Sequence, residues 1–168
     1  KLTQLIVPLI IEQFLAIAMG AVDTVMVSQV GQAAVSGVSL VDSINILLIN
    51  IFAALATGGA VVASQYLGRR NVEKAQNAAK QLLFAILTVS TLVAVLCLIF
   101  RVPLLRLAFN QVDADVKANA QTYFWLSALS YPFIAIYNGG AALFRAMGNS
   151  RIAMVTSLIM NGFNVVGN

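Results

Sequence analysis

Two carboxylates lie inside the first apolar stretch of this 168-residue chain, and they are the first residues with a capacity for chemistry. Glu12 and Asp23 are the charged residues of an otherwise apolar segment that runs from Leu2 to Val30. They are eleven residues apart, which in an α-helix is a rotation of about 20°, so both project from one face. A carboxylate at membrane depth is costly and usually marks a functional site that faces a bundle interior or a cavity.

The two carboxylates differ in what they predict. For Glu12, a hydrogen bond to a neighbouring helix and a place in a transport pathway are equally consistent with the sequence. For Asp23 a functional role is favoured, because the span continues beyond it in VDTVMV. A bound proton or a Na⁺ ion is the chemistry expected there, since carboxylate and amide oxygens are hard ligands.

A polar stripe near the end of the chain supplies such amides. Its asparagines follow i, i+3, i+7 spacing, at Asn161, Asn164 and Asn168, and asparagine stripes also hold helices together through hydrogen bonds. If this helix and the first helix enter from the same membrane face, Asp23 lies ~27 Å along its helix, and Asn164 and Asn168 lie ~18 and ~24 Å along theirs. We therefore expect the side chains of Asp23, Asn164 and Asn168 to meet and to form a ligand set for a proton or a Na⁺ ion.

Further polar residues lie in the second and fourth apolar stretches. Together with Glu12, the candidates for a substrate pathway are Asn45, Tyr131, Tyr137 and Asn138. For the two tyrosines, an interfacial or packing role is equally consistent with the sequence. Pro132 is expected to kink the fourth stretch and to free backbone groups along such a pathway. Asp42 is expected near the outer end of its helix, in a helix-start or interfacial role or in contact with substrate.

The composition of the chain predicts that membrane-spanning helices position these residues. Hydrophobic residues make up 60% of the chain, charged residues 10%, and the mean hydropathy is +0.90. Soluble domains carry about 25% charged residues, so this composition predicts an all-α integral membrane bundle. Basic residues form no dense cluster, which excludes a nucleic-acid partner. With no histidine and a single cysteine, Cys97, a His-based triad, a His-ligated metal and an intramolecular disulfide are also excluded.

Uncharged runs divide the chain into five expected membrane-spanning helices. They cover about residues 5–27, 34–67, 78–100, 116–143 and 152–168, near or above the ~18 residues that a span needs. Of the ten Lys and Arg residues, seven lie before the first helix or in the second and fourth connections, and three in the third. The positive-inside rule then predicts a multi-pass cell-membrane protein with a cytoplasmic N-terminus. Because Asn168 ends the chain within an apolar stretch, we expect a fragment of a longer chain.

Three segments resemble the multidrug and toxic compound extrusion (MATE) family of efflux transporters. They are PLIIEQFLAIAMGAVDTVMVSQVG, ATGGAVVASQYLGRRNVEKA and YNGGAALFRAMGNSR. The resemblance implies that residues 1–168 are a partial N-terminal lobe, five helices of six, completed by the remaining C-terminal part of the chain. It also implies export of cationic or amphipathic organic compounds, including drugs and toxins, in exchange for H⁺ or Na⁺, with no other cofactor.

The resemblance also implies roles for individual residues. Asp23 matches a coupling-ion residue of the family's first helix. Asn164 and Asn168 match an Asn and Asp pair of the fifth helix, so this chain has one carboxylate fewer there. That departure weakens a two-carboxylate mechanism.

Three other functions are weaker on the sequence. A lipid-linked precursor flippase of the same superfamily is the runner-up. Such flippases usually need a strongly cationic cavity for pyrophosphate, but Arg and Lys are absent from the expected span interiors. A membrane enzyme would need a nucleophile–base set or a set of metal ligands, and this sequence provides neither. A purely structural membrane protein leaves Glu12 and Asp23 uncompensated.

Overall fold

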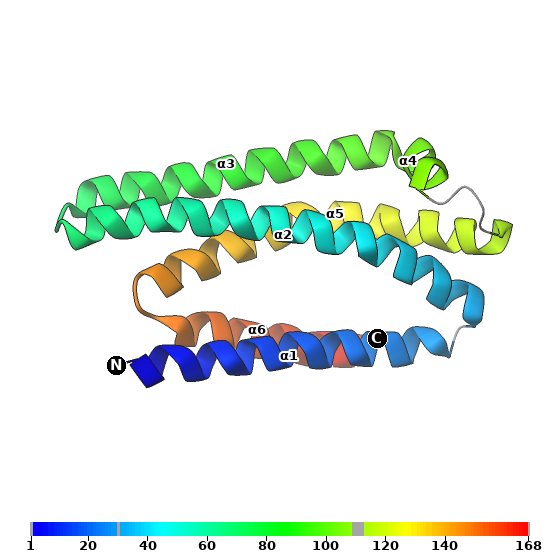
Figure 1. Ribbon diagram of the computed structural model, residues 1–168, viewed down its shortest axis with the longest axis horizontal. Coiled ribbons are helices and arrows are strands. Elements are labelled where there is room, and N and C mark those ends of the chain that lie inside the picture. The colour runs from blue at the N-terminus through cyan, green and yellow to red at the C-terminus, as the bar shows by residue number, and fades with distance from the viewer. Residues whose placement is uncertain (1, 30, 109–112, 168) are drawn as a thin grey trace.

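The protein is described by a computed structural model whose described residues are 2–29, 31–108 and 113–167 (Figure 1). These residues form helices and no strand. The helices are α1 (Leu2–Ser28), α2 (Gln32–Gly68), α3 (Val72–Ile99), α4 (Arg101–Ala108), α5 (Ala114–Ala146) and α6 (Ser150–Gly167). The all-helical fold class that the sequence predicts is confirmed, and the five expected helices correspond to α1, α2, α3, α5 and α6.

Two features of the helical pattern differ from the sequence prediction. The third helix begins at Val72 rather than near residue 78, because the Asn71 side chain accepts a hydrogen bond from the Lys74 backbone N–H at 3.1 Å and caps the helix. A short helix, α4, occupies part of the third connection, which was predicted to be loop. Pro103 lies in its first turn, where a missing N–H removes no helical hydrogen bond, and Leu105 anchors it in the core.

Helices α2, α3 and α5 pack into a three-helix bundle that contains the core (Figure 1). Buried residues recur about every fourth position along each helix. They include Phe52, Ala56, Ala60 and Ala63 on α2; Leu82, Ile86, Ser90, Ala94 and Cys97 on α3; and Ala120, Phe124, Ala128, Tyr131 and Ala135 on α5. So many small residues let the backbones approach closely, as in helix packing within membranes.

The backbones of α2 and α5 approach each other closely at Gly37. A Cβ atom built on this glycine would lie 3.0 Å from the backbone N of Ala120 and 3.0 Å from the carbonyl O of Val116. Backbone atoms of a packed helix have little room to move, so this crossing requires glycine. Two glycines further along α2 differ in their surroundings: Gly59 faces Leu82 of α3, whereas Gly58 faces open space.

Helices α1 and α6 form a separate pair beside the bundle and run in the same direction (Figure 1). The second half of α5 descends toward α6, and a turn with Gly148 at a φ of 80° links the two helices. Most of α1 is exposed, including the large apolar side chains of Ile10, Phe14 and Ile17. The molecule therefore has two layers, which α5 joins at the end where α1 begins.

The outer surface suits a bilayer rather than water. Large apolar side chains are exposed on every long helix, among them Phe84, Ile99, Phe133 and Phe163. Within the described residues, Ile6–Ser28, α2 and α3 are long and apolar enough to cross a membrane, and α6 adds a shorter apolar stretch, Ser150–Met160. Helix α5 is long but more polar, because it carries Asp115, Lys117 and Arg145. The chain is a membrane protein by composition and helix length.

Candidate functional site

A polar cluster joins the two layers of the molecule, and Glu12 of α1 is at its centre. A guanidinium nitrogen of Arg145, in the last turn of α5, lies 3.1 Å from one carboxylate oxygen of Glu12 and 3.3 Å from the other. The Tyr137 hydroxyl of α5 donates a hydrogen bond of 3.3 Å to the same carboxylate, and Ser157 of α6 is a hydrogen-bond neighbour of that hydroxyl. The cluster therefore connects α1, α5 and α6.

Because this ion pair is partly buried, its loss is more costly than the loss of a surface salt bridge. The Glu12 side chain is 14% exposed and that of Arg145 is 31% exposed, so water screens the pair only in part. Removing one partner would leave a charge in a poorly solvated place, which is the costly case for buried pairs. Of the two sequence interpretations of Glu12, the structure provides the hydrogen bonds of the first and brings Tyr137, a second pathway candidate, onto the same carboxylate.

A second polar network lies inside the three-helix bundle, between α2 and α5. The Tyr131 hydroxyl donates to the Asn45 side-chain oxygen at 2.7 Å, and the Asn45 amide donates to Asp42 and to Ser127 at 3.3 Å each. Tyr123 donates to the same Asp42 oxygen at 3.2 Å. Two more pathway candidates, Asn45 and Tyr131, are thus directly hydrogen-bonded to each other.

Burial makes this second network part of the core. Tyr131 is 1% exposed and Asn45 is 8% exposed, and the Tyr131 ring meets Phe52 edge-on at a centroid distance of 6.1 Å. Asp42 lies ten residues after Gln32, the first residue of α2, or about 15 Å along the axis. It is therefore not a helix-start residue, and it accepts hydrogen bonds from two helices.

The expected coupling-ion residues are described less completely. Asp23 and Asn164 lie within α1 and α6, but their side chains are outside the described residues, and Asn168 is outside them altogether. The two helices that carry Asp23 and Asn164 are neighbours and run in the same direction (Figure 1). That arrangement is the premise on which the meeting of these side chains was predicted.

Asn138, the remaining pathway candidate, belongs to neither polar cluster. Asn138 is half-buried on α5, next in sequence to Tyr137. In the part of the chain that the structure describes, no three His, Cys, Asp or Glu side chains gather into a group that would hold a metal.

Sequence reasoning missed four members of the two clusters. It assigned Arg145 to a cytoplasmic connection, and it did not single out Ser157, Tyr123 or Ser127. A periodicity signal was available for the last two, because residues 123, 127 and 131 follow i, i+4, i+8 spacing and share one helix face. No comparable signal links Arg145 to Glu12, which are 133 residues apart.

Comparison with known proteins agrees with these features. A family model described as MatE matches residues 8–168. The chain is 30% identical over 163 residues to a protein named "Uncharacterized transporter YisQ" from Bacillus subtilis (strain 168), which covers 96% of this chain. The chain spans 35% of the length of that relative. The search of solved structures found no match.

Proposed function

Because the chain belongs to the MatE family of membrane transporters, we propose that it acts as part of a secondary-active efflux antiporter. The antiporter exports cationic or amphipathic organic compounds in exchange for H⁺ or Na⁺. These residues supply five spanning helices of an N-terminal lobe, α1, α2, α3, α5 and α6, and the rest of the transporter completes the substrate cavity. The N-terminus and the α2–α3 and α5–α6 turns face the cytoplasm, following the excess of basic residues at that end.

The observation that carries the proposal is the division into two layers joined by the Glu12–Arg145 ion pair. Alternating access needs two arrangements of the same helices whose balance a bound ion changes. The α1–α6 pair is the part suited to move, because it lies beside the bundle rather than inside it and connects to α5 through Glu12, Tyr137 and Arg145. Rigid-body movement of one layer against another commonly exchanges interface salt bridges of this kind for new ones.

The coupling ion in this proposal binds Asp23, with Asn164 and Asn168 as amide ligands. The neighbouring, parallel course of α1 and α6 supports that grouping. Asn168 supplies a neutral oxygen where a carboxylate would add charge, so Asp23 alone provides the negative charge. A coupling ion acts by its differential affinity for the two arrangements, and one carboxylate is sufficient for one H⁺ or Na⁺ per cycle.

The antiporter is favoured over the flippase by the charge of the helix interiors. A flippase for pyrophosphate-linked lipids needs unpaired cations inside the lobe. Within the described residues, Arg145 reaches between the two layers, and Glu12 neutralises it.

Substitution of Asp23 tests the proposal in the full-length transporter. Asp23→Asn should abolish ion-driven dye efflux, because an amide of nearly the same shape neither carries charge nor releases a proton. The matched control is Asp115→Asn, an exposed residue in the first turn of α5, which should pump normally. Efflux rates are compared in vesicles at equal transporter abundance under an imposed H⁺ or Na⁺ gradient. Wild-type efflux by Asp23→Asn would show that the coupling site lies elsewhere.

A further inference from the structure

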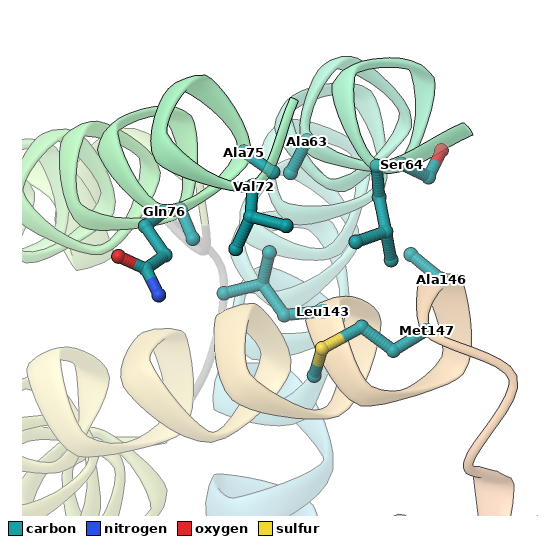
Figure 2. A pocket seen from close by; sticks show the side chains of 10 residues that line it. Ala63, Ser64, Val72, Ala75, Gln76, Leu143, Ala146 and Met147 are labelled. Carbon is teal, nitrogen blue, oxygen red and sulfur yellow. The ribbon is translucent and has the colours of Figure 1, made fainter. Parts of the chain in front are cut away.

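An apolar cavity lies at the end of the three-helix bundle, where α2 ends, α3 begins and α5 ends. Its volume is about 230 Å³, and its walls are almost wholly apolar. Figure 2 shows side chains from the three helices converging on it, with Val72 and Ala75 from α3, Ala63 from α2, and Leu143 from α5. Met147, which directly follows α5, completes this wall. The cavity uses no residue of the two polar clusters described above.

Water does not suit this cavity. An ordered water needs two to four polar partners, and these apolar walls offer few. The Ser64 hydroxyl at the wall already donates to the Val61 carbonyl at 2.8 Å, and Gln76 is exposed at the rim. The occupant that matches the walls is a hydrocarbon chain.

Basic residues lie next to the cavity on one side. Leu67 and Val72 are wall residues, and the turn between them contains Arg69 and Arg70, both exposed. Lys74 follows within the next turn of helix, and Glu73 is the one acidic residue among these positions. This charge repels the cationic compounds proposed as substrates and attracts an anion.

The strained backbone conformation of Arg70 indicates a functional role for its side chain. Arg70 has a φ of 57°, a left-handed backbone that is strained for residues with a side chain. The Asn71 N–H donates to the Tyr66 carbonyl, and the Arg70 N–H donates to the Leu67 carbonyl, which is the Schellman ending of α2. The α5–α6 turn has the same two hydrogen bonds with Gly148 at the equivalent position. Arginine stands where glycine is unstrained, and such strain is typical of functional positions.

We propose that this end of the bundle binds an anionic phospholipid, with the phosphate on Arg69 and Arg70 and the upper part of one acyl chain in the cavity. The level in the membrane fits this ligand. Helix α2 is 37 residues long, or about 55 Å, whereas the hydrocarbon core of a bilayer is about 30 Å thick. The end of α2 therefore lies near the headgroups, where basic pockets between helices recruit anionic lipids from the cytoplasmic leaflet.

Lipid counting on the full-length transporter tests the proposal. The protein is purified in mild detergent, freed of bulk lipid, and mixed with phosphatidylglycerol or with phosphatidylcholine of the same chains; native mass spectrometry counts bound lipid. Wild type should retain phosphatidylglycerol in preference. R69Q/R70Q should bind it about thirtyfold more weakly, which corresponds to about 1 kcal/mol for each arginine. R101Q/R106Q, which removes two arginines of α4 at the opposite end of the bundle, should bind as wild type does.

Two more variants separate lipid binding from damage to the fold. R70G should weaken phosphatidylglycerol binding about fivefold while leaving thermal stability equal or higher, because glycine relieves the strain at this position. Ala75→Leu, which fills the cavity, should weaken binding of the lipid, whereas Ala54→Leu on an exposed part of α2 should not.

Three results would overturn the proposal. The first is equal retention of phosphatidylcholine and phosphatidylglycerol by wild type. The second is unchanged phosphatidylglycerol binding by R69Q/R70Q. The third is full displacement of the lipid by soluble glycerol phosphate together with normal binding by Ala75→Leu, which would assign the turn to a free anion and leave the cavity without a role.

Discussion

Removal of one hydroxyl from the core network should measurably destabilise the transporter. The Tyr131 hydroxyl donates its hydrogen bond to Asn45 at 2.7 Å, the usual length for an O–H···O bond. Tyr131→Phe keeps the ring and its edge-on packing against Phe52. The substitution therefore isolates the hydroxyl and leaves the Asn45 carbonyl oxygen without its donor.

The expected size follows from burial and from the membrane setting. Both partners are nearly inaccessible, at 1% and 8% exposure, and an orphaned buried acceptor costs about 1–3 kcal/mol in water-soluble proteins. Hydrogen bonds between helices in membranes average about 0.6 kcal/mol, with a maximum of about 1.7. We expect Tyr131→Phe to lower the free energy of unfolding by about 1 kcal/mol, roughly a fivefold change in the unfolding equilibrium.

Unfolding of the full-length protein in mixed detergent and dodecyl sulfate micelles provides the assay. Tyr66→Phe is the control, since the Tyr66 hydroxyl has no hydrogen-bond partner among the described residues. A double-mutant cycle with Asn45→Ala should recover a coupling of about 0.5–2 kcal/mol, the range for residues in one network. Equal stability of Tyr131→Phe and wild type, or a coupling near zero, would contradict the core role of this bond.

The same unfolding assay checks two further predictions. Gly37→Ala should lower stability by about 1–3 kcal/mol, because its Cβ would lie only 3.0 Å from backbone atoms of α5 and would push the two helices apart. Gly58→Ala, with open space around it, should raise stability by up to about 1 kcal/mol through helix propensity. Equal effects of the two substitutions would disprove the close crossing. Arg145→Gln should lower stability by about 1–2 kcal/mol, less than the 3–5 of a fully buried pair, and adding Glu12→Gln should restore part of the loss. A double variant less stable than Arg145→Gln alone would argue against the ion pair.

The limits of sequence reasoning appear at particular residues. The sequence did not predict helix α4, because eight residues with a proline and two arginines show no apolar run. Its anchor is Leu105, which is buried in the core that α2, α3 and α5 form. The start of α3 was placed late because the expectation followed hydropathy, whereas the cap at Asn71 begins the helix within a polar segment.

The sequence by itself determined that this protein lies in a lipid bilayer, that its fold is helical, and that it belongs to the MatE family. Hydropathy, uncharged runs and the short segments that resemble MATE transporters are local properties, and the bilayer requires each apolar run to satisfy its own backbone as a helix. Tertiary structure alone decided which polar residues meet: Glu12 with Arg145, and Asn45 with Tyr131. Those pairings depend on the rotation and axial offset of packed helices, which are set by the fit of small and large side chains across whole interfaces rather than by any local segment.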